Sequence, residues 1–219
     1  MVAATSTLGL RERKKERTRK TIVDVATRLF EQQGYHETTL AQVAEAADVA
    51  SSTFFNYFPT KIDIVFCLLD AVVESAQRRI IERPDDESAS DAIAAWLTEE
   101  LPDVEQPYAE AIRRFPKIVA SAPELRSEER LRLALLEDVL AEGFARDLDE
   151  SADGLRARVL AAMAMCAILE AWRAWFEKHA TDADFQLADA LEAKARHVAR
   201  VLARGLEFIE LLPGPAATG

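Results

Sequence analysis

The side chains best suited to recognising another molecule lie in one short stretch, from Ser51 to Lys61. The stretch offers hydroxyl groups, one carboxamide and one ammonium group, which together supply hydrogen-bond donors and acceptors. Four aromatic rings are interleaved with these groups between residues 54 and 58, and Pro59 follows them. This segment is too short for a core helix and too aromatic for an ordinary loop, so its role depends on the elements that position it.

The rest of the sequence contains no arrangement typical of catalysis. The three histidines, His36, His179 and His197, have no ligand or triad spacing with Cys, Asp or Glu, and no Gly-rich phosphate loop is present. Cys67 and Cys166 are far apart in apolar surroundings, which predicts buried free thiols. We therefore expect no enzyme, no cofactor and no metal site.

Composition predicts an all-α protein. Gly and Pro are few, at 7 and 8 residues, and alternating runs of β-branched residues are missing. The longest apolar run, residues 159–169, is much shorter than the ~18 residues of a membrane span. The basic N-terminus lacks the apolar segment of a signal peptide. These features predict a cytoplasmic protein that does not contact a membrane.

Charge is distributed unevenly along the chain. The net charge is -11, yet residues 1–65 carry nine Lys or Arg and eight Asp or Glu. Seven of these nine positive charges fall within residues 11–20. The acidity therefore belongs to the later part of the chain and does not exclude nucleic acid as a partner of the N-terminal part.

Two helices are expected before the aromatic stretch. The first carries apolar residues at spacings of three and four and ends near Gly34, a suitable C-terminal cap. The second begins at Thr39, whose spacing to Gln42 fits a capping box. Asp48 then occupies the sharp turn, where a left-handed backbone is tolerated better by Asp than by most residues.

The aromatic stretch itself predicts a third helix, Ser51 to Phe58, that ends at Pro59. Phe54 and Phe58 are four apart and should be buried against the first two helices. The other side chains then project outward, with Tyr57 on the flank, and a fourth helix begins near Thr60.

Short helices joined by a tight turn and supported by a longer helix form a helix-turn-helix, whose second helix enters the DNA major groove. The exposed groups suit this role, because Asn can read adenine and the ring of Phe55 can contact a thymine methyl group. Lys61 would donate to a phosphate near a helix N-terminus.

The segment "GYHETTLAQVAEAADVASSTFFNYFPTKIDIV" resembles the DNA-binding domain of the tetracycline-repressor (TetR) family over residues 15–65. The resemblance implies phosphate contacts from Thr38, Tyr35, Tyr57 and Lys61, and a basic arm that follows the DNA backbone or an adjacent minor groove. It implies base-facing contacts from Ser51, Ser52, Thr53, Phe55 and Asn56. Tyr35 can equally be a core residue.

Two positions depart from the family pattern. Asp48 stands where Gly is frequent, and Ala50 stands where Ser often caps the recognition helix. The cap could pass to Ser51, which leaves open whether Ser51 or Ser52 faces a base.

We expect a tail at residues 1–10, a helix-turn-helix domain at 11–65, a helical effector-binding and dimerisation domain at 66–212, and a tail at 213–219. The last two helices, beginning at residues 155 and 181, carry long apolar faces, which predicts a four-helix interface in a homodimer. Two recognition helices, about one DNA turn (~34 Å) apart or a multiple, would then read a palindrome in double-stranded DNA.

In this family an effector in the C-terminal domain moves the fourth helix, and a ligand pocket is mostly apolar with a few polar groups. We expect a small apolar or amphipathic effector, with candidate residues Phe66, Trp96, Tyr108, Ile112, Phe115, Phe144, Met163, Glu170 and Trp172. Each of these can instead be a core residue, and Glu170 can simply pair with Arg173. The expected function is a repressor released by its effector. The alternatives are an activator or a sensor that acts with a protein partner, and, least favoured, a small helical enzyme.

Overall fold

The computed structural model describes residues 9–179 and residue 201, and these residues form helices and turns without a strand. The chain divides into two compact units: residues 1–67 with 107–126, and residues 68–106 with 127–219. The predicted all-α class is confirmed for the described part of the chain.

The first unit is organised around α1 (Leu10–Gln33), a helix about 36 Å long at 1.5 Å per residue. The basic run therefore lies within the helix, which begins directly after Gly9. The helix ends where predicted, at Gly34, whose φ of 96° is a conformation that side chains other than Gly disfavour. Residues 1–8 of the predicted tail lie outside the described residues.

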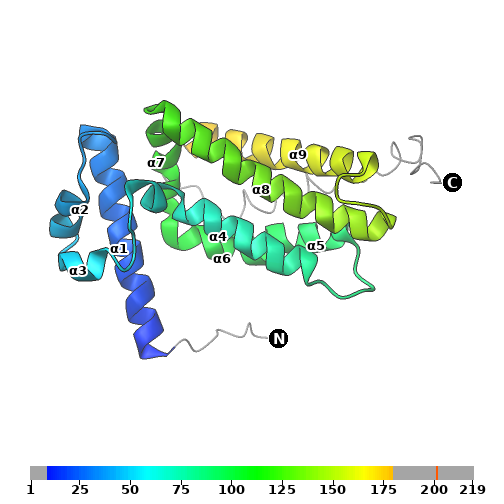
Figure 1. Cartoon of the computed structure of the whole chain (residues 1–219), viewed down its shortest axis with the longest axis horizontal. Coiled ribbons are helices and arrows are strands. Elements are labelled where there is room, and N and C mark those ends of the chain that lie inside the picture. The colour runs from blue at the N-terminus through cyan, green and yellow to red at the C-terminus, as the bar shows by residue number, and fades with distance from the viewer. Residues whose placement is uncertain (1–8, 180–200, 202–219) are drawn as a thin grey trace. The chain divides into compact units, whose positions relative to one another are not determined.

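The short helices α2 (Leu40–Ala46) and α3 (Ser51–Phe54) lie beside α1 in this unit (Figure 1). The predicted third helix was too long, because only its first turn is α-helical. Asn56 and Tyr57 bond to carbonyls three residues back, which tightens the chain before Pro59. The residue before a proline avoids helical backbone angles, which explains why the helix does not continue.

The helix α7 (Ala109–Ala120) packs against α1 and completes the first unit. Residues 107–126 thus belong to the same compact unit as the N-terminal helices, although they lie far along the chain. The sequence analysis instead placed residues 107–126 in the C-terminal domain, after a boundary between residues 65 and 66.

The second unit combines long helices with short ones. The helix α4 (Lys61–Ile81) begins in the first unit and continues into the second, and α5 (Ala89–Ala95) follows a polar turn. The remaining helices are α8 (Pro123–Leu148), most of which lies in this unit, and α9 (Leu155–His179). The two run side by side (Figure 1), and Arg158 of α9 pairs with Asp138 of α8 at 2.6 Å.

An irregular helical segment joins α5 to α7. It consists of the π-helix η1 (Trp96–Glu100), the helix α6 (Leu101–Glu105) and the 3-10 turn η2 (Gln106–Tyr108). Pro102 has no N–H for the ordinary helical bond, and Leu101 just before it donates to the carbonyl of Trp96, five residues back. Trp96, at the start of this widened turn, is fully buried, and its Nε1 donates to Ser75 Oγ at 2.9 Å.

Two sequence expectations need comment. Cys67 is buried as predicted, but Cys166 is exposed on α9, so the prediction of two buried thiols was wrong for Cys166. The final predicted helix, from residue 181, and the tail at 213–219 lie outside the described residues apart from residue 201. Within the described part of the chain, no helix has both the length and the apolar character needed to cross a bilayer.

Candidate nucleic-acid interface

The turn between α2 and α3 has the predicted construction. Thr39 and Gln42 form a reciprocal capping box, in which Gln42 N donates to Thr39 Oγ1 and Thr39 N donates to Gln42 Oε1. Asp48 has a φ of 54°, in the left-handed region, and the N–H of Val49 returns to the carbonyl of Ala44. These local bonds fix the angle between the two helices.

The predicted base-facing residues share one property, which is exposure to solvent. They are Ser51, Ser52, Thr53, Phe55 and Asn56. Phe55 is 50% exposed, whereas its neighbours Phe54 and Phe58 are 0% and 1% exposed. The two buried rings therefore anchor the segment as predicted, and the structure gathers the polar set with Phe55 on its outer face.

Neither serine caps the recognition helix. The helix begins after Ala50, which has no side-chain cap, and the Ala50 carbonyl accepts bonds from Thr53 and Phe54. The possible shift of the cap to Ser51 is therefore not observed. Both Ser51 and Ser52 are instead exposed in the first turn, so each hydroxyl faces solvent.

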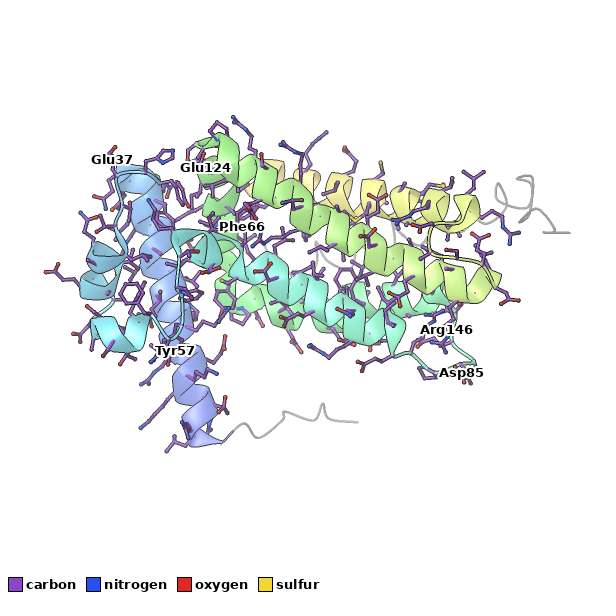
Figure 2. All side chains as sticks on the ribbon, in the orientation of Figure 1. Glu37, Tyr57, Phe66, Asp85, Glu124 and Arg146 are labelled. Carbon is purple, nitrogen blue, oxygen red and sulfur yellow. The ribbon has the colours of Figure 1, made fainter. Side chains whose placement is uncertain are left out.

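The other predicted phosphate contacts occupy different environments. Thr38 is fully buried and its hydroxyl donates to the Gly34 carbonyl at 2.8 Å, which supports the turn after α1. Tyr35 is 6% exposed and is therefore a core residue. Tyr57, labelled in Figure 2, is partly exposed.

Lys61 has a structural role that the sequence does not reveal. Its Nζ donates to the carbonyls of Tyr35 at 2.7 Å and His36 at 3.2 Å. The ammonium also lies 4.5 Å from the centre of the Tyr35 ring, a cation–π contact. Lys61 thus ties the start of α4 to the turn after α1 and still has one N–H to offer. No local sequence pattern signals a bond across 26 residues.

Replacing Lys61 with Met should destabilise the protein by about 1.5–3 kcal/mol, because hydrogen bonds from a charged donor are lost. Chemical denaturation monitored by circular dichroism measures this change. Lys117→Met is the matched control, since Lys117 is 77% exposed and its pair with Glu31 should contribute about 1 kcal/mol or less. Equal effects of the two substitutions would show that the carbonyl tether does not contribute.

A polar seam joins α1 to α7. Glu31 forms ion pairs with Arg114 at 3.3 Å and Lys117 at 3.0 Å, and Glu16 accepts a hydrogen bond from the hydroxyl of Tyr108 at 2.6 Å. Burial, followed by the bond to Glu16, raises the pKa of Tyr108 well above its ordinary value, so the phenol stays protonated and remains a donor. Sequence reasoning gave Tyr108 as an effector-site candidate or a core residue and did not predict these contacts between α1 and α7.

The predicted effector residues fall into both units. Phe66, Tyr108, Ile112 and Phe115 lie in the first, and Trp96, Phe144, Met163, Glu170 and Trp172 lie in the second. Phe66 and Phe115 meet edge to face, with their ring centres 5.7 Å apart. Trp96 and Phe144 are buried in the second unit. Glu170 is 60% exposed and pairs with Arg173 at 3.0 Å, which is the simpler of its two expected roles.

Two protein families match this chain. The family described as bacterial regulatory proteins, tetR family, matches residues 22–66, and the MftR C-terminal domain matches residues 87–203. The first match spans the helix-turn-helix just described. The second covers more than half of the chain and lies outside that segment.

Individual proteins agree with both matches. The regulator TcmR of Streptomyces glaucescens is 30% identical over 183 residues, which are 80% of each chain. The crystal structure of NalD, the secondary repressor of the MexAB-OprM efflux pump in Pseudomonas aeruginosa, shares the fold with a TM-score of 0.54 and 20% identity, over 88% of this chain and 97% of NalD. The SmeT–triclosan complex has a TM-score of 0.57 and 18% identity over 93% and 98% of the two chains.

Together with these matches, the two short helices and their buried aromatic anchors define a helix-turn-helix transcriptional regulator, whose described residues form helices and turns without a strand. The chain belongs to the TetR family of bacterial transcriptional regulators. The expectation of a regulator rather than an enzyme agrees with this family.

Proposed function

We propose that the protein is a homodimeric repressor that binds a palindromic operator and is released by a small, mostly apolar effector. The observation that carries the DNA-binding part is the outer face of the α3 segment. It presents hydroxyls, one carboxamide and one exposed ring, while Phe54 and Phe58 hold the segment from beneath. These groups match the chemistry of base edges and the thymine methyl group.

Homodimerisation is supported by an apolar face on α9. Leu155 and Leu169 are 57% and 38% exposed, and Ala162 and Cys166 between them are also exposed. On a helix these positions fall along one side, at intervals of three, four and seven. Burial in a second copy would remove this apolar surface from water, and the dimer would provide the two recognition helices that a palindrome requires.

Release by a small apolar effector is supported by the aromatic content of the later part of the chain. Trp96 and Phe144 lie in the interior of the second unit, and Trp172 and Phe176 of α9 are only partly buried there. Aromatic and aliphatic side chains typically line effector pockets. The related fold of SmeT was solved in a complex with triclosan.

Selection of bound sequences from random DNA duplexes tests the operator proposal. We expect the protein to enrich a palindrome, and Asn56→Ala to lose preference at one position in each half-site by about 1–3 kcal/mol. Tyr57→Phe should instead weaken binding to all sequences by a similar factor, because a phosphate contact carries no sequence information.

Asp85→Asn in the second unit is the control for this selection, since Asp85 is fully exposed and lies outside the helix-turn-helix. It should bind the same sequences as the unmodified protein. Enrichment without symmetry would contradict the homodimer on a palindrome. An unchanged preference in Asn56→Ala would contradict the assigned reading role of Asn56.

A further inference from the structure

One carboxylate of α8 lies on the apolar side of its helix. Glu129 precedes Leu136 by about two turns and Leu140 by about three, so each leucine lies within roughly 20° of Glu129 around the axis. Leu136 and Leu140 are both 0% exposed, and Glu129 itself is half-buried. A glutamate is rarely buried unless it is paired, so its presence on this side requires a physical reason.

This side of α8 faces α4 within the second unit. Arg132, one turn after Glu129, donates from its Nε to Asp70 Oδ1 of α4 at 2.7 Å. The α4 side chains close to Asp70 are Leu69 and Val72, which are 6% and 1% exposed. Neither of them carries a hydrogen-bond donor that could reach a carboxylate.

The buried residues of α9 at the same level are also apolar. The ion pair between Asp138 and Arg158 aligns α8 with α9, and the two helices run in opposite directions (Figure 1). Glu129 lies nine residues before Asp138, and Ala167 lies nine residues after Arg158, so Glu129 and Ala167 are at the same level. Ala167 and Ile168 are 4% and 0% exposed, and their side chains have no polar atoms.

No described residue neutralises the Glu129 carboxylate. It forms no hydrogen bond or ion pair with the described part of the chain, and Arg130 beside it donates to Ser127 Oγ at 3.0 Å instead. Burial raises the pKa of the Glu129 carboxyl, and the charge of Arg130 offsets this effect only in part. A half-buried carboxylate without a partner costs free energy, which a bound ligand of opposite charge would recover.

We propose that Glu129 is the charged anchor of the effector site, and that the effector is an amphipathic cation, an apolar body that carries a protonated amine. This inference rests on the proposed release by an effector and specifies the chemistry of that effector. An ammonium group would form charge-assisted hydrogen bonds with the carboxylate, while the apolar body would contact the aliphatic side chains of α4 and α9. A neutral donor would leave the charge of Glu129 uncompensated, so an amine is favoured over the alcohol of the same shape.

Amines and alcohols that share one apolar skeleton test this inference. The pairs are phenylbutylamine with phenylbutanol and adamantylmethylamine with adamantylmethanol, and their binding is measured by titration calorimetry. The unmodified protein should bind an amine roughly tenfold or more tightly than its alcohol, because a hydrogen bond between charged groups is stronger than one to a neutral group. Glu129→Gln should bind both members of a pair equally. Glu142→Gln removes an exposed charge from the far side of α8 and should keep the preference for the amine.

The pH dependence of binding and the stability without ligand provide independent measurements. Amine affinity should fall as the pH is lowered through the raised pKa of Glu129, because protonation removes the charge, and Glu129→Gln should lose this dependence. The cost of the buried charge is present above the native pKa of Glu129 and absent at acid pH. At neutral pH, ligand-free Glu129→Gln should therefore melt at the same temperature as the unmodified protein or higher. A clearly lower melting temperature would show that the carboxylate serves the fold, and would overturn the proposal.

The remaining outcomes separate this inference from the proposed function. Alcohols, or carboxylates of the same skeletons, that bind the unmodified protein as tightly as the amines would overturn the cationic effector. An amine preference that persists in Glu129→Gln, or a failure of every pair to bind, would also overturn it. Release of a selected operator, followed by fluorescence anisotropy, should require less amine than alcohol. Compounds of every class that bind without releasing the operator would instead contradict the proposed control by an effector.

Discussion

Phe54→Ala should lower the free energy of unfolding by about 3–5 kcal/mol and abolish sequence-specific DNA binding, although Phe54 contacts no base in the proposed complex. Its ring is completely buried and anchors the recognition segment. Loss of the ring leaves a cavity beneath residues whose positions must match the major groove. Thermal unfolding and binding to a selected operator measure the two effects.

Phe55→Ala is the matched control at the next position. Phe55 is 50% exposed and meets Phe54 edge to face at 5.7 Å, so its removal should cost about 1 kcal/mol or less. It should nevertheless reduce discrimination between thymine and uracil at one operator position, since uracil lacks the methyl group. A stability loss in Phe55→Ala as large as that in Phe54→Ala would contradict the assignment of inner and outer faces.

Arg83→Ala should destabilise the protein by about 3–5 kcal/mol, because the guanidinium is a buried charge with several partners. Its side chain is 1% exposed and pairs with Asp147, which also accepts from the N–H of Ala89 at 2.6 Å. Further bonds reach the carbonyls of Ile80 at 2.7 Å, Glu87 at 3.0 Å and Gly143 at 2.9 Å. Removing Arg83 would leave these acceptors without their donor. Equilibrium denaturation in urea measures the loss.

Arg146→Ala provides the comparison for Arg83. Arg146 is a spatial neighbour of Arg83, because its guanidinium donates to the Arg83 carbonyl at 3.2 Å. Its side chain is 36% exposed, however, and its partner Asp85 is fully exposed (Figure 2). We expect a cost of about 1 kcal/mol or less. A loss for Arg83→Ala as small as that for Arg146→Ala would show that the buried network is not a major source of stability.

Local patterns in the sequence predicted the helix-turn-helix well, because its construction depends on bonds between near neighbours. The Thr39–Gln42 capping box, the left-handed backbone at Asp48 and the end of α1 at Gly34 each involve a few consecutive residues. The burial of Phe54 and Phe58 agrees with their spacing of four residues, although the α-helix itself ends at Phe54. The start of α3 was not predictable in this way, since Ala50 begins the helix through its backbone and leaves both serines exposed.

Contacts between distant residues could not be predicted. The bond from Lys61 to Tyr35 spans 26 residues, and the bond from Tyr108 to Glu16 spans 92. Neither pair has a spacing that secondary structure explains, and each partner has a plausible alternative role. The aromatic residues proposed for the effector site illustrate the same limit, because periodicity indicates burial but does not distinguish a buried core residue from one that lines a pocket.

The packing of α7 against α1 determines which residues are needed to form the first unit. The N-terminal unit is discontinuous in sequence, because residues 107–126 complete it after an excursion through the second unit. A fragment that ends after the helix-turn-helix would lack the partners of Glu16 and Glu31. A chimera that exchanges DNA specificity between relatives should therefore carry over both segments together. The DNA-binding unit is thus encoded by two separate stretches of sequence.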